Sequence, residues 1–519
     1  MSSPINMELL APAGGMEQLR AAVLFGADAV YLAADRFGMR ARAANFAMAD
    51  VPAAVAFAHE HGVKVHVTCN VLMHPDDIDA LPAFFRTLDA AGVDAFIIAD
   101  MGAFAVAGEV APRVERHVST QASVANGAAA RVWHSLGATR VVCAREMSLD
   151  DIRRLREDVP PDLQIEAFAH GAMCMAVSGR CLISSYLTGR SGNKGHCTQP
   201  CRWSYTLGTE RGVDGAPGGA VCALGDVRSA SAVRNACRVP ETAAYAESGE
   251  PQFLLEEEKR PGEFFPIEED GRGTFIMNAK DLNMLAHLDA LAAAGVDSIK
   301  IEGRNKKAFY VASVVGAYRR VLDGEPAAAV ADELLAISHR PYGTGFYFDE
   351  AEQAPAYEGY EQETMHVADV VACEAESPVG QCPMGAASAR GAAGCPSDPR
   401  GAPHTSGPQP HSEPTYLYVL CRNRFAEGDE LEVLAPHEPT RTIAVRDLHW
   451  LPTFGPDVHD EDAPATPEEA LTRAAAADWE PAATANRSCN LYRLTVEAPV
   501  PAGSFLRVRT FRRSARHGG

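Results

Sequence analysis

Short apolar runs alternate with longer, amphipathic and alanine-rich runs from Glu8 to about Arg320. A short apolar run is typical of a buried strand, and a longer run with helical periodicity is typical of a helix packed on it. Repetition of this pair predicts βα units, and eight strands of this kind predict a (β/α)8 TIM-type barrel. The predicted strands are Leu9–Ala11, Ala29–Ala33, Val63–Thr68, Ala95–Ile98, Arg116–Ser119, Arg140–Cys143, Gln164–Ala169 and Ser298–Glu302.

A long segment separates the last two predicted strands. It begins with the cysteine-rich stretch Cys174–Cys201 and continues through the irregular Gly/Ala/Ser-rich stretch Gly208–Gly249. We therefore predict a barrel domain over residues 1–350 that carries an insertion at 171–297. Insertions at the carboxyl ends of barrel strands can close over an active site.

A second domain is predicted after the amphipathic run Tyr310–Leu322 and the exit loop His339–Phe348. Short strand-like runs recur from residue 351 to 519 and predict a small β-barrel. Segments 378–414 and 456–486 are rich in Pro, Gly, Ala or acidic residues and predict flexible loops. The strand-like runs are Met365–Ala372, Thr415–Cys421, Glu430–Leu434, Thr442–Leu448, Leu491–Val496 and Ser504–Val508.

Composition restricts the class of protein. Hydrophobic residues make up 47% of the chain and charged residues 22%, as in soluble globular proteins. The formal charge of -21 argues against nonspecific coating of nucleic acid, although local basic patches remain compatible with it. Because no run reaches the roughly 18 apolar residues of a membrane helix, we expect a cytoplasmic protein without membrane contact. The pattern leaves its oligomeric state open.

Four cysteines cluster in the predicted insertion. Cys174, Cys181, Cys197 and Cys201 are separated by six, fifteen and three residues. Four thiolates bind either zinc or a [4Fe–4S] cluster, and zinc usually selects two short pairs. With a single close pair, the spacing favours the [4Fe–4S] cluster. Cys237 is an alternative fourth ligand, and free buried thiols are the structural alternative.

The same region carries a family resemblance. Glu166-Ala-Phe-Ala-His-Gly-Ala-Met-Cys174, followed by Ser178-Gly-Arg-Cys181-Leu-Ile-Ser184, resembles the signature of the U32 peptidase family. The resemblance covers residues 8 to about 350 and resumes in the β-rich C-terminal part. Other phrases that agree are Pro12–Gly14, Gly26–Tyr31, Arg42–Phe46, Ser119–Ser123, Asn193–Trp203, Asn278–Leu282 and Lys300–Arg304.

One branch of that family fits best. Arg260–Pro266 and Thr274–Asn278 are most similar to the branch that hydroxylates uridine-34 of tRNA with prephenate. The resemblance implies an iron–sulfur enzyme that forms 5-hydroxyuridine, with tRNA and prephenate as substrates. Other branches act on ribosomal RNA, act on ubiquinone precursors, or are described as collagen-degrading peptidases. The ribosomal RNA and peptidase activities remain alternatives.

Peptide hydrolysis would need an activated nucleophile or a metal-bound water. The sequence contains neither His-Glu-x-x-His nor Gly-x-Ser-x-Gly. A spatial pair of Cys174 with His170 is the peptidase arrangement that the sequence leaves open.

Candidate site residues follow from the resemblance and from their places at predicted strand ends. Prephenate is a dicarboxylate, which Arg, Lys and His side chains hold best. Glu302 paired with Lys300 or Arg304 is equally compatible with a structural ion pair. The predicted catalytic residues are Glu166, His170, Lys300, Glu302 and Arg304. The predicted substrate-binding residues are Arg42, Asn70, His117, Gln121, Arg180, Arg202 and Trp203.

The substrate-binding residues would have different partners. Arg42 and His117 are candidates for the carboxylates, and Asn70 and Gln121 for substrate hydroxyls. Arg180 and Arg202 lie in the cysteine-rich segment and are candidates for RNA phosphates, with Trp203 stacking on an extruded base. A core position is the alternative for Trp203, as it is for the two amides.

Overall fold

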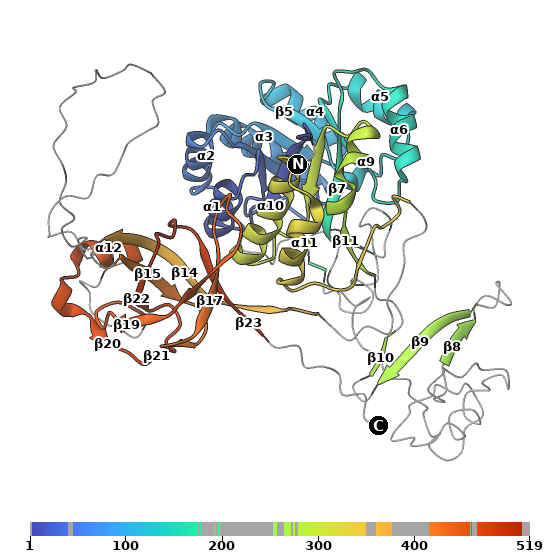
Figure 1. Cartoon of the computed structure of the whole chain (residues 1–519). Coiled ribbons are helices and arrows are strands. Elements are labelled where there is room, and N and C mark those ends of the chain that lie inside the picture. The colour runs from blue at the N-terminus through green and yellow to red at the C-terminus, as the bar shows by residue number, and fades with distance from the viewer. Residues whose placement is uncertain are drawn as a thin grey trace, which may run out of the picture. The chain divides into compact units, whose positions relative to one another are not determined.

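The computed structural model describes residues 3–39, 45–174, 253–256, 264–270, 273–275, 279–348, 360–375, 415–456 and 466–510, and single residues at 177, 184, 190, 193, 196, 197, 458 and 464. The chain divides into two compact units (Figure 1). The first comprises Met1–Thr364 with Thr510–Gly519, and the second comprises Met365–Arg509.

Eight parallel strands close into a barrel in the first unit. Their order is β1 to β7 followed by β12, and β12 pairs in parallel with both β7 and β1. The predicted barrel is thereby confirmed, with strand ends within a few residues of those expected. The strands are β1 (Glu8–Pro12), β2 (Ala29–Leu32), β3 (Lys64–Cys69), β4 (Ala95–Ile98), β5 (Glu115–Val118), β6 (Arg140–Val142), β7 (Gln164–Ala172) and β12 (Ser298–Ile301).

Helices follow the strands and surround them (Figure 1). Polar side chains fix several helix starts: Ser148 Oγ accepts a hydrogen bond from Asp151 N at the start of α6, and Asp100 does the same for Ala103 N at α4. The helices are α1 (Met16–Leu24), α2 (Val51–Glu60), α3 (Pro75–Ala90), α4 (Met101–Val110), α5 (Gly127–Ser135), α6 (Leu149–Asp158), α9 (Leu288–Ala293), α10 (Ala308–Leu322) and α11 (Ala327–Leu335), with 3-10 turns η1 (Thr120–Ala122) and η5 (Leu285–His287).

Strand β7 runs beyond its predicted end and gains another neighbour. Its last residues pair with the antiparallel strand β11 (Asp281–Asn283), which in turn pairs in parallel with β13 (Tyr342–Gly343). The segment 339–348, predicted to be an exit loop, therefore joins the sheet through β13. Within the predicted insertion, β8 (Phe253–Glu256), β9 (Phe264–Asp270) and β10 (Gly273–Phe275) form an antiparallel sheet.

The second unit is a curled antiparallel sheet with strand order β18-β17-β23-β14-β15-β22-β19-β20, and a two-stranded pair β16–β21 accompanies it. One face buries a core that includes Val419, Leu431 and Leu494. The strands are β14 (Thr364–Ala375), β15 (Thr415–Cys421), β16 (Phe425–Ala426), β17 (Glu430–Leu434), β18 (Arg441–Ala444), β19 (Arg446–Trp450), β20 (Glu480–Pro481), β21 (Thr484–Ala485), β22 (Leu491–Val496) and β23 (Phe505–Arg509).

Part of segment 456–486 is ordered, contrary to the loop predicted from its composition. It contains helix α12 (Pro467–Arg473), the turn η6 (Ala476–Asp478) and strands β20 and β21. The reason is burial: Ala470 and Trp479 form a small core with Leu451 and Leu491. Among the described helices, none combines the length and the apolar character that crossing a bilayer requires.

Candidate active site

The barrel interior holds a charged network at the amino ends of its strands. The Arg140 guanidinium, on β6, donates to both carboxylate oxygens of Glu8 on β1, at 2.6 and 2.9 Å. It also donates to Glu166 Oε2 at 3.1 Å and to Gln164 Oε1 at 2.7 Å. Burial alone would raise the pKa of Glu8, but the hydrogen bond and charge of Arg140 lower it to about 2. These contacts tie together strands that are distant in sequence.

Lys300 completes this network. Its Nζ lies 2.7 Å from Glu166 Oε1 and 4.5 Å from the centroid of the Tyr31 ring. Burial lowers the pKa of Lys300, and the Glu166 carboxylate acts against that shift. Two acids, Glu8 and Glu166, thus face two bases, Arg140 and Lys300, so the interior charges balance.

His117 lies inside the barrel as well. Its Nε2 is 3.0 Å from Glu115 Oε2, and its ring meets the His66 ring edge to face at 4.8 Å between centroids. Burial, with the positive charges of Arg140 and Lys300, holds the pKa of His117 well below its usual range. A neutral, fully buried imidazole that already contacts Glu115 offers no positive charge to a substrate carboxylate. Its placement therefore favours a role in filling the barrel.

Polar groups also gather at the carboxyl ends of the strands, where barrel enzymes carry their active sites. Arg304 follows β12, is nearly buried, and donates from Nη1 to Thr68 Oγ1 at 3.2 Å. Arg145 follows β6, and its Nη2 lies 3.7 Å from Glu302 Oε2. The Arg145 guanidinium also stacks on Phe168, with 3.9 Å from Cζ to the ring centroid. Sequence reasoning missed Arg145, although it follows a predicted strand just as Arg304 does.

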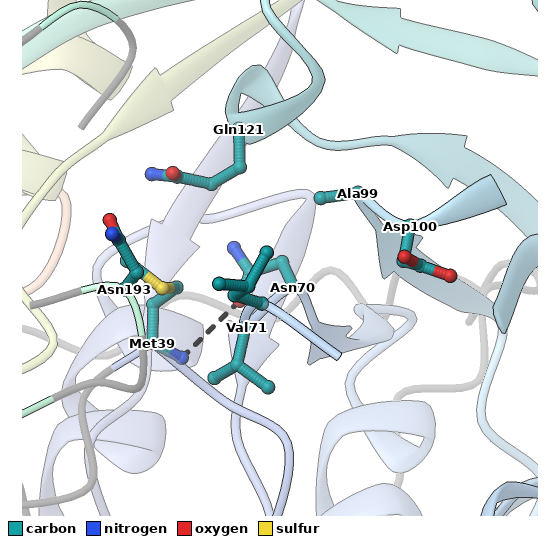
Figure 2. Close-up of a pocket in the computed structure, with 8 residues that line it drawn as sticks. Met39, Asn70, Val71, Ala99, Asp100, Gln121 and Asn193 are labelled. Carbon is teal, nitrogen blue, oxygen red and sulfur yellow. Dashed lines mark hydrogen bonds between the residues drawn. The ribbon is translucent and has the colours of Figure 1, made fainter. Parts of the chain in front are cut away.

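A cavity of about 170 Å³ opens at this end of the barrel (Figure 2). Residues that follow β3, β4 and β5 contribute most of its wall, so it lies at the carboxyl end of the barrel. Asn193, from the cysteine-rich segment, lines it too, and its backbone carbonyl oxygen accepts a 2.9 Å hydrogen bond from Leu72 N. The lining residues are Met39, Asn70, Val71, Leu72, Ala99, Asp100, Gln121 and Asn193.

His170 lies away from this mouth. Its ring is buried and packs against Tyr310, Tyr318 and Tyr342, with Nδ1 3.4 Å from the Tyr318 hydroxyl oxygen. Burial and the nearby cations lower the pKa of His170 to about 3. The side chain therefore faces helix α10, and its contacts are those of a core residue.

The described cysteines of the first unit fall into two groups. Cys69 and Cys143 are buried in the barrel, and burial raises the pKa of the Cys143 thiol to about 12. Cys174 and Cys197 are exposed: Cys174 follows β7 by two residues, and Cys197 lies four residues beyond Asn193. The predicted site residues Arg42, Arg180, Cys181, Cys201, Arg202 and Trp203, with the alternative ligand Cys237, lie outside the described residues.

Comparison with known proteins decides the family. The model of peptidase family U32 matches residues 14–356, which is the greater part of the chain and covers the barrel from α1 onward. The chain belongs to peptidase family U32. U32 membership agrees with the resemblance that the cysteine motif and the strand-end phrases carry.

Proteins similar to this chain have names from two reaction classes. The chain is 37% identical over 344 residues to "tRNA hydroxylation protein P" of Escherichia coli, covering 65% of this chain and 74% of that protein. It is 35% identical over 318 residues to the "23S rRNA 5-hydroxycytidine C2501 synthase" of the same organism, covering 61% and 39%. It is 30% identical over 360 residues to a "Collagenase" of Porphyromonas gingivalis, covering 66% and 73%.

Proposed function

We propose that this chain is an iron–sulfur-dependent tRNA hydroxylase that adds a hydroxyl group at C5 of wobble uridine-34, with prephenate as co-substrate. The observation that carries the proposal is the 344-residue match to a tRNA hydroxylation protein. Together with the rRNA hydroxycytidine synthase, it supports a nucleic-acid hydroxylase. The uridine position and prephenate are proposed from the likeness of Arg260–Pro266 and Thr274–Asn278 to that branch of the family.

The described thiols fit a cluster in the cysteine-rich segment. A cluster ligand must be a thiolate, and burial keeps the Cys69 and Cys143 thiols protonated. Cys174 and Cys197 are exposed and belong to a segment that contacts the barrel mouth through Asn193. With Cys181 and Cys201 they would hold a [4Fe–4S] cluster, which when bound by all four thiolates could transfer electrons.

Two arginines at the mouth support binding of a dicarboxylate. Arg304 and Arg145 follow β12 and β6, and a guanidinium can grip a carboxylate through two parallel hydrogen bonds. Lys300 is a weaker candidate, since it is buried against Glu166. In this proposal Arg304 and Arg145 hold the two carboxylates of prephenate, and Glu302 orients Arg145.

The peptidase alternative lacks the pair that it requires. Cys174 is exposed, whereas the His170 ring is enclosed by tyrosines and faces α10. A base held in this way does not activate an exposed thiol, because hydrogen-bond reach is a condition of nucleophilic catalysis. The geometry of the described residues therefore favours the hydroxylase.

The test is mass spectrometry of tRNA nucleosides from cells that lack the gene, with wild-type or Cys181→Ala copies returned. We expect 5-hydroxyuridine-derived nucleosides to disappear and to return with the wild-type copy alone. Iron and acid-labile sulfide are measured on the protein purified without oxygen. If the nucleosides do not change on deletion, in cells that lack any second enzyme making the same nucleoside, the tRNA assignment is overturned. Iron at background would overturn the cluster.

A further inference from the structure

The cavity at the barrel mouth has a distinctive chemistry. Three of its eight lining side chains are primary amides, those of Asn70, Gln121 and Asn193. The others are apolar except for Asp100, so none of the described lining residues carries a positive charge. Figure 2 shows the Gln121 and Asn193 amides on the same side of the cavity, while the Asp100 carboxylate points away from them.

This lining is unsuited to a dicarboxylate. Carboxylates bind where Arg, Lys or His can neutralise them, and a cavity whose one ionisable group is an aspartate would repel them. An amide side chain, by contrast, offers both a donor NH2 group and an acceptor oxygen. Amides therefore suit a neutral ring whose edge alternates donors and acceptors, as the pairing edge of a nucleobase does.

Two of the amide residues are held in place, Asn70 through its side chain and Gln121 through its backbone. Asn70 Nδ2 donates to Ser119 Oγ at 3.2 Å, and its Oδ1 accepts from Met39 N at 3.3 Å. Ser119 Oγ also accepts from Gln121 N at 3.3 Å, at the start of the 3-10 turn that carries Gln121. A site fixed before the ligand arrives loses less conformational entropy on binding.

Apolar surface adjoins the cavity. Leu72, which lines it, is 56% exposed, and Met101, the residue after Asp100, is 58% exposed. An exposed apolar side chain at the rim of a polar cavity can pack on the face of an unstacked base. Apolar packing and edge recognition together are what a single-stranded base requires.

We propose that this cavity holds the target pyrimidine after it has left the stack of its RNA loop, with the Gln121 and Asn193 amides reading its edge. The inference rests on the proposed function for the identity of the substrate. It adds that base and dicarboxylate occupy separate subsites, the base in the amide cavity and the carboxylates at the arginines. Enzymes that modify a base commonly extrude it into a fitted pocket.

The test measures binding rather than turnover, so that it does not depend on the hydroxylation. The affinity of the full-length protein is measured for an unmodified anticodon stem–loop RNA and for copies that carry one abasic site in turn at each loop uridine. Wild-type protein should bind the intact RNA about tenfold more tightly than one of the abasic copies, because the abasic copy lacks the hydrogen bonds and packing that the target base makes.

Matched variants locate that discrimination. Gln121→Glu and Asn193→Asp keep shape but remove the NH2 donors, and should bring the intact-to-abasic ratio close to one. Asn126→Asp adds the same charge at the exposed cap of α5 and should leave the ratio unchanged. For the rim, Leu72→Ala should lower the ratio about threefold, whereas Val132→Ala, at 54% exposure on α5, should not.

The outcomes separate the inference from the function. Hydroxylated tRNA together with equal affinities for intact and abasic RNAs would overturn the base site and leave the hydroxylase standing. Discrimination that depends on Gln121 in a protein that hydroxylates no tRNA would support the base site and remove the proposed reaction. Discrimination that survives both amide variants would also overturn the inference, because the base would then be read elsewhere.

Discussion

Replacing Glu166 by Gln tests whether the charges inside the barrel are held by mutual compensation. The Glu166 side chain is fully buried and accepts from Lys300 at 2.7 Å and from Arg140 at 3.1 Å. Glutamine preserves the size of the side chain and removes its charge. Arg140 keeps Glu8 as a partner, whereas Lys300 loses the carboxylate within its reach. The substitution therefore leaves one buried cation poorly compensated.

The expected cost is large. Removing one member of a buried ion pair typically destabilises a protein by about 3–5 kcal/mol, because the remaining charge is left without its partner. The double variant Glu166→Gln/Lys300→Met removes both members, and we expect it to be about 2 kcal/mol more stable than Glu166→Gln alone. Asp323→Asn is the surface control. It breaks an ion pair with Arg319 in which the Asp323 side chain is 61% exposed, and should cost under about 1 kcal/mol.

The assay must report on the barrel alone, since a chain of two units need not unfold in one step. Hydrogen exchange in urea, followed by mass spectrometry of peptides from β6, β7 and β12, meets this condition. With a slope of roughly 3 kcal/mol per molar urea, Glu166→Gln should lower the midpoint by about 1 M or more. A midpoint like that of Asp323→Asn, or a double variant less stable than Glu166→Gln, would refute the argument.

Three further predictions concern other parts of the barrel unit. Burial lowers the pKa of His170 to about 3, below its unfolded value of 6.5, so the stability that the neutral ring contributes above pH 6.5 is lost as the pH falls toward 3. His170→Phe should therefore flatten the acid limb of the stability curve between these values. Arg304→Gln should raise the KM for prephenate about 10- to 100-fold with little change in RNA affinity, and an unchanged KM would exclude Arg304 from the carboxylate site. Gly171 has φ +112, and a Cβ there would lie 2.6 Å from the Glu302 carbonyl oxygen, whereas Gly62, at φ +74, has open space. Gly171→Ala should therefore lower the urea midpoint more than Gly62→Ala, and equal shifts would contradict the close approach.

The barrel strands were predictable because they are short, buried on both faces and bounded by turn residues, which leaves a clear apolar signal. Strands β11 and β13 lack such a signal. They contain three and two residues, and their pairing depends on the extension of β7 rather than on their own sequence. Helix α12 was hidden by an acidic and alanine-rich composition, although Thr466 before Pro467 is a recognisable helix start.

Part of the candidate site followed from the rule that barrel chemistry lies at the carboxyl ends of strands. Asn70, Gln121 and Arg304 satisfy that rule and lie at the mouth. His170 shows its limit. Simple alternation along β7 would give His170 the inward direction of Glu166, but the pairing with β12 shifts register between Lys300 and Ile301. Such an irregularity reverses the face to which the following side chain points, and no sequence pattern announced it.

The interior network was beyond prediction for a related reason. Arg140 and Glu8 begin strands 132 residues apart, and their contact depends on the stagger of a closed barrel. The position of this charged network at the amino ends of the barrel strands suits a role in stability, while the uncharged amides at the carboxyl ends suit a role in recognition. Lys300 and Arg304 illustrate the division within a few residues: Lys300 faces a carboxylate inside the barrel, and Arg304 donates to the Thr68 hydroxyl at its mouth. Substitutions in the network should therefore change unfolding before they change substrate affinity, and substitutions at the mouth should do the reverse.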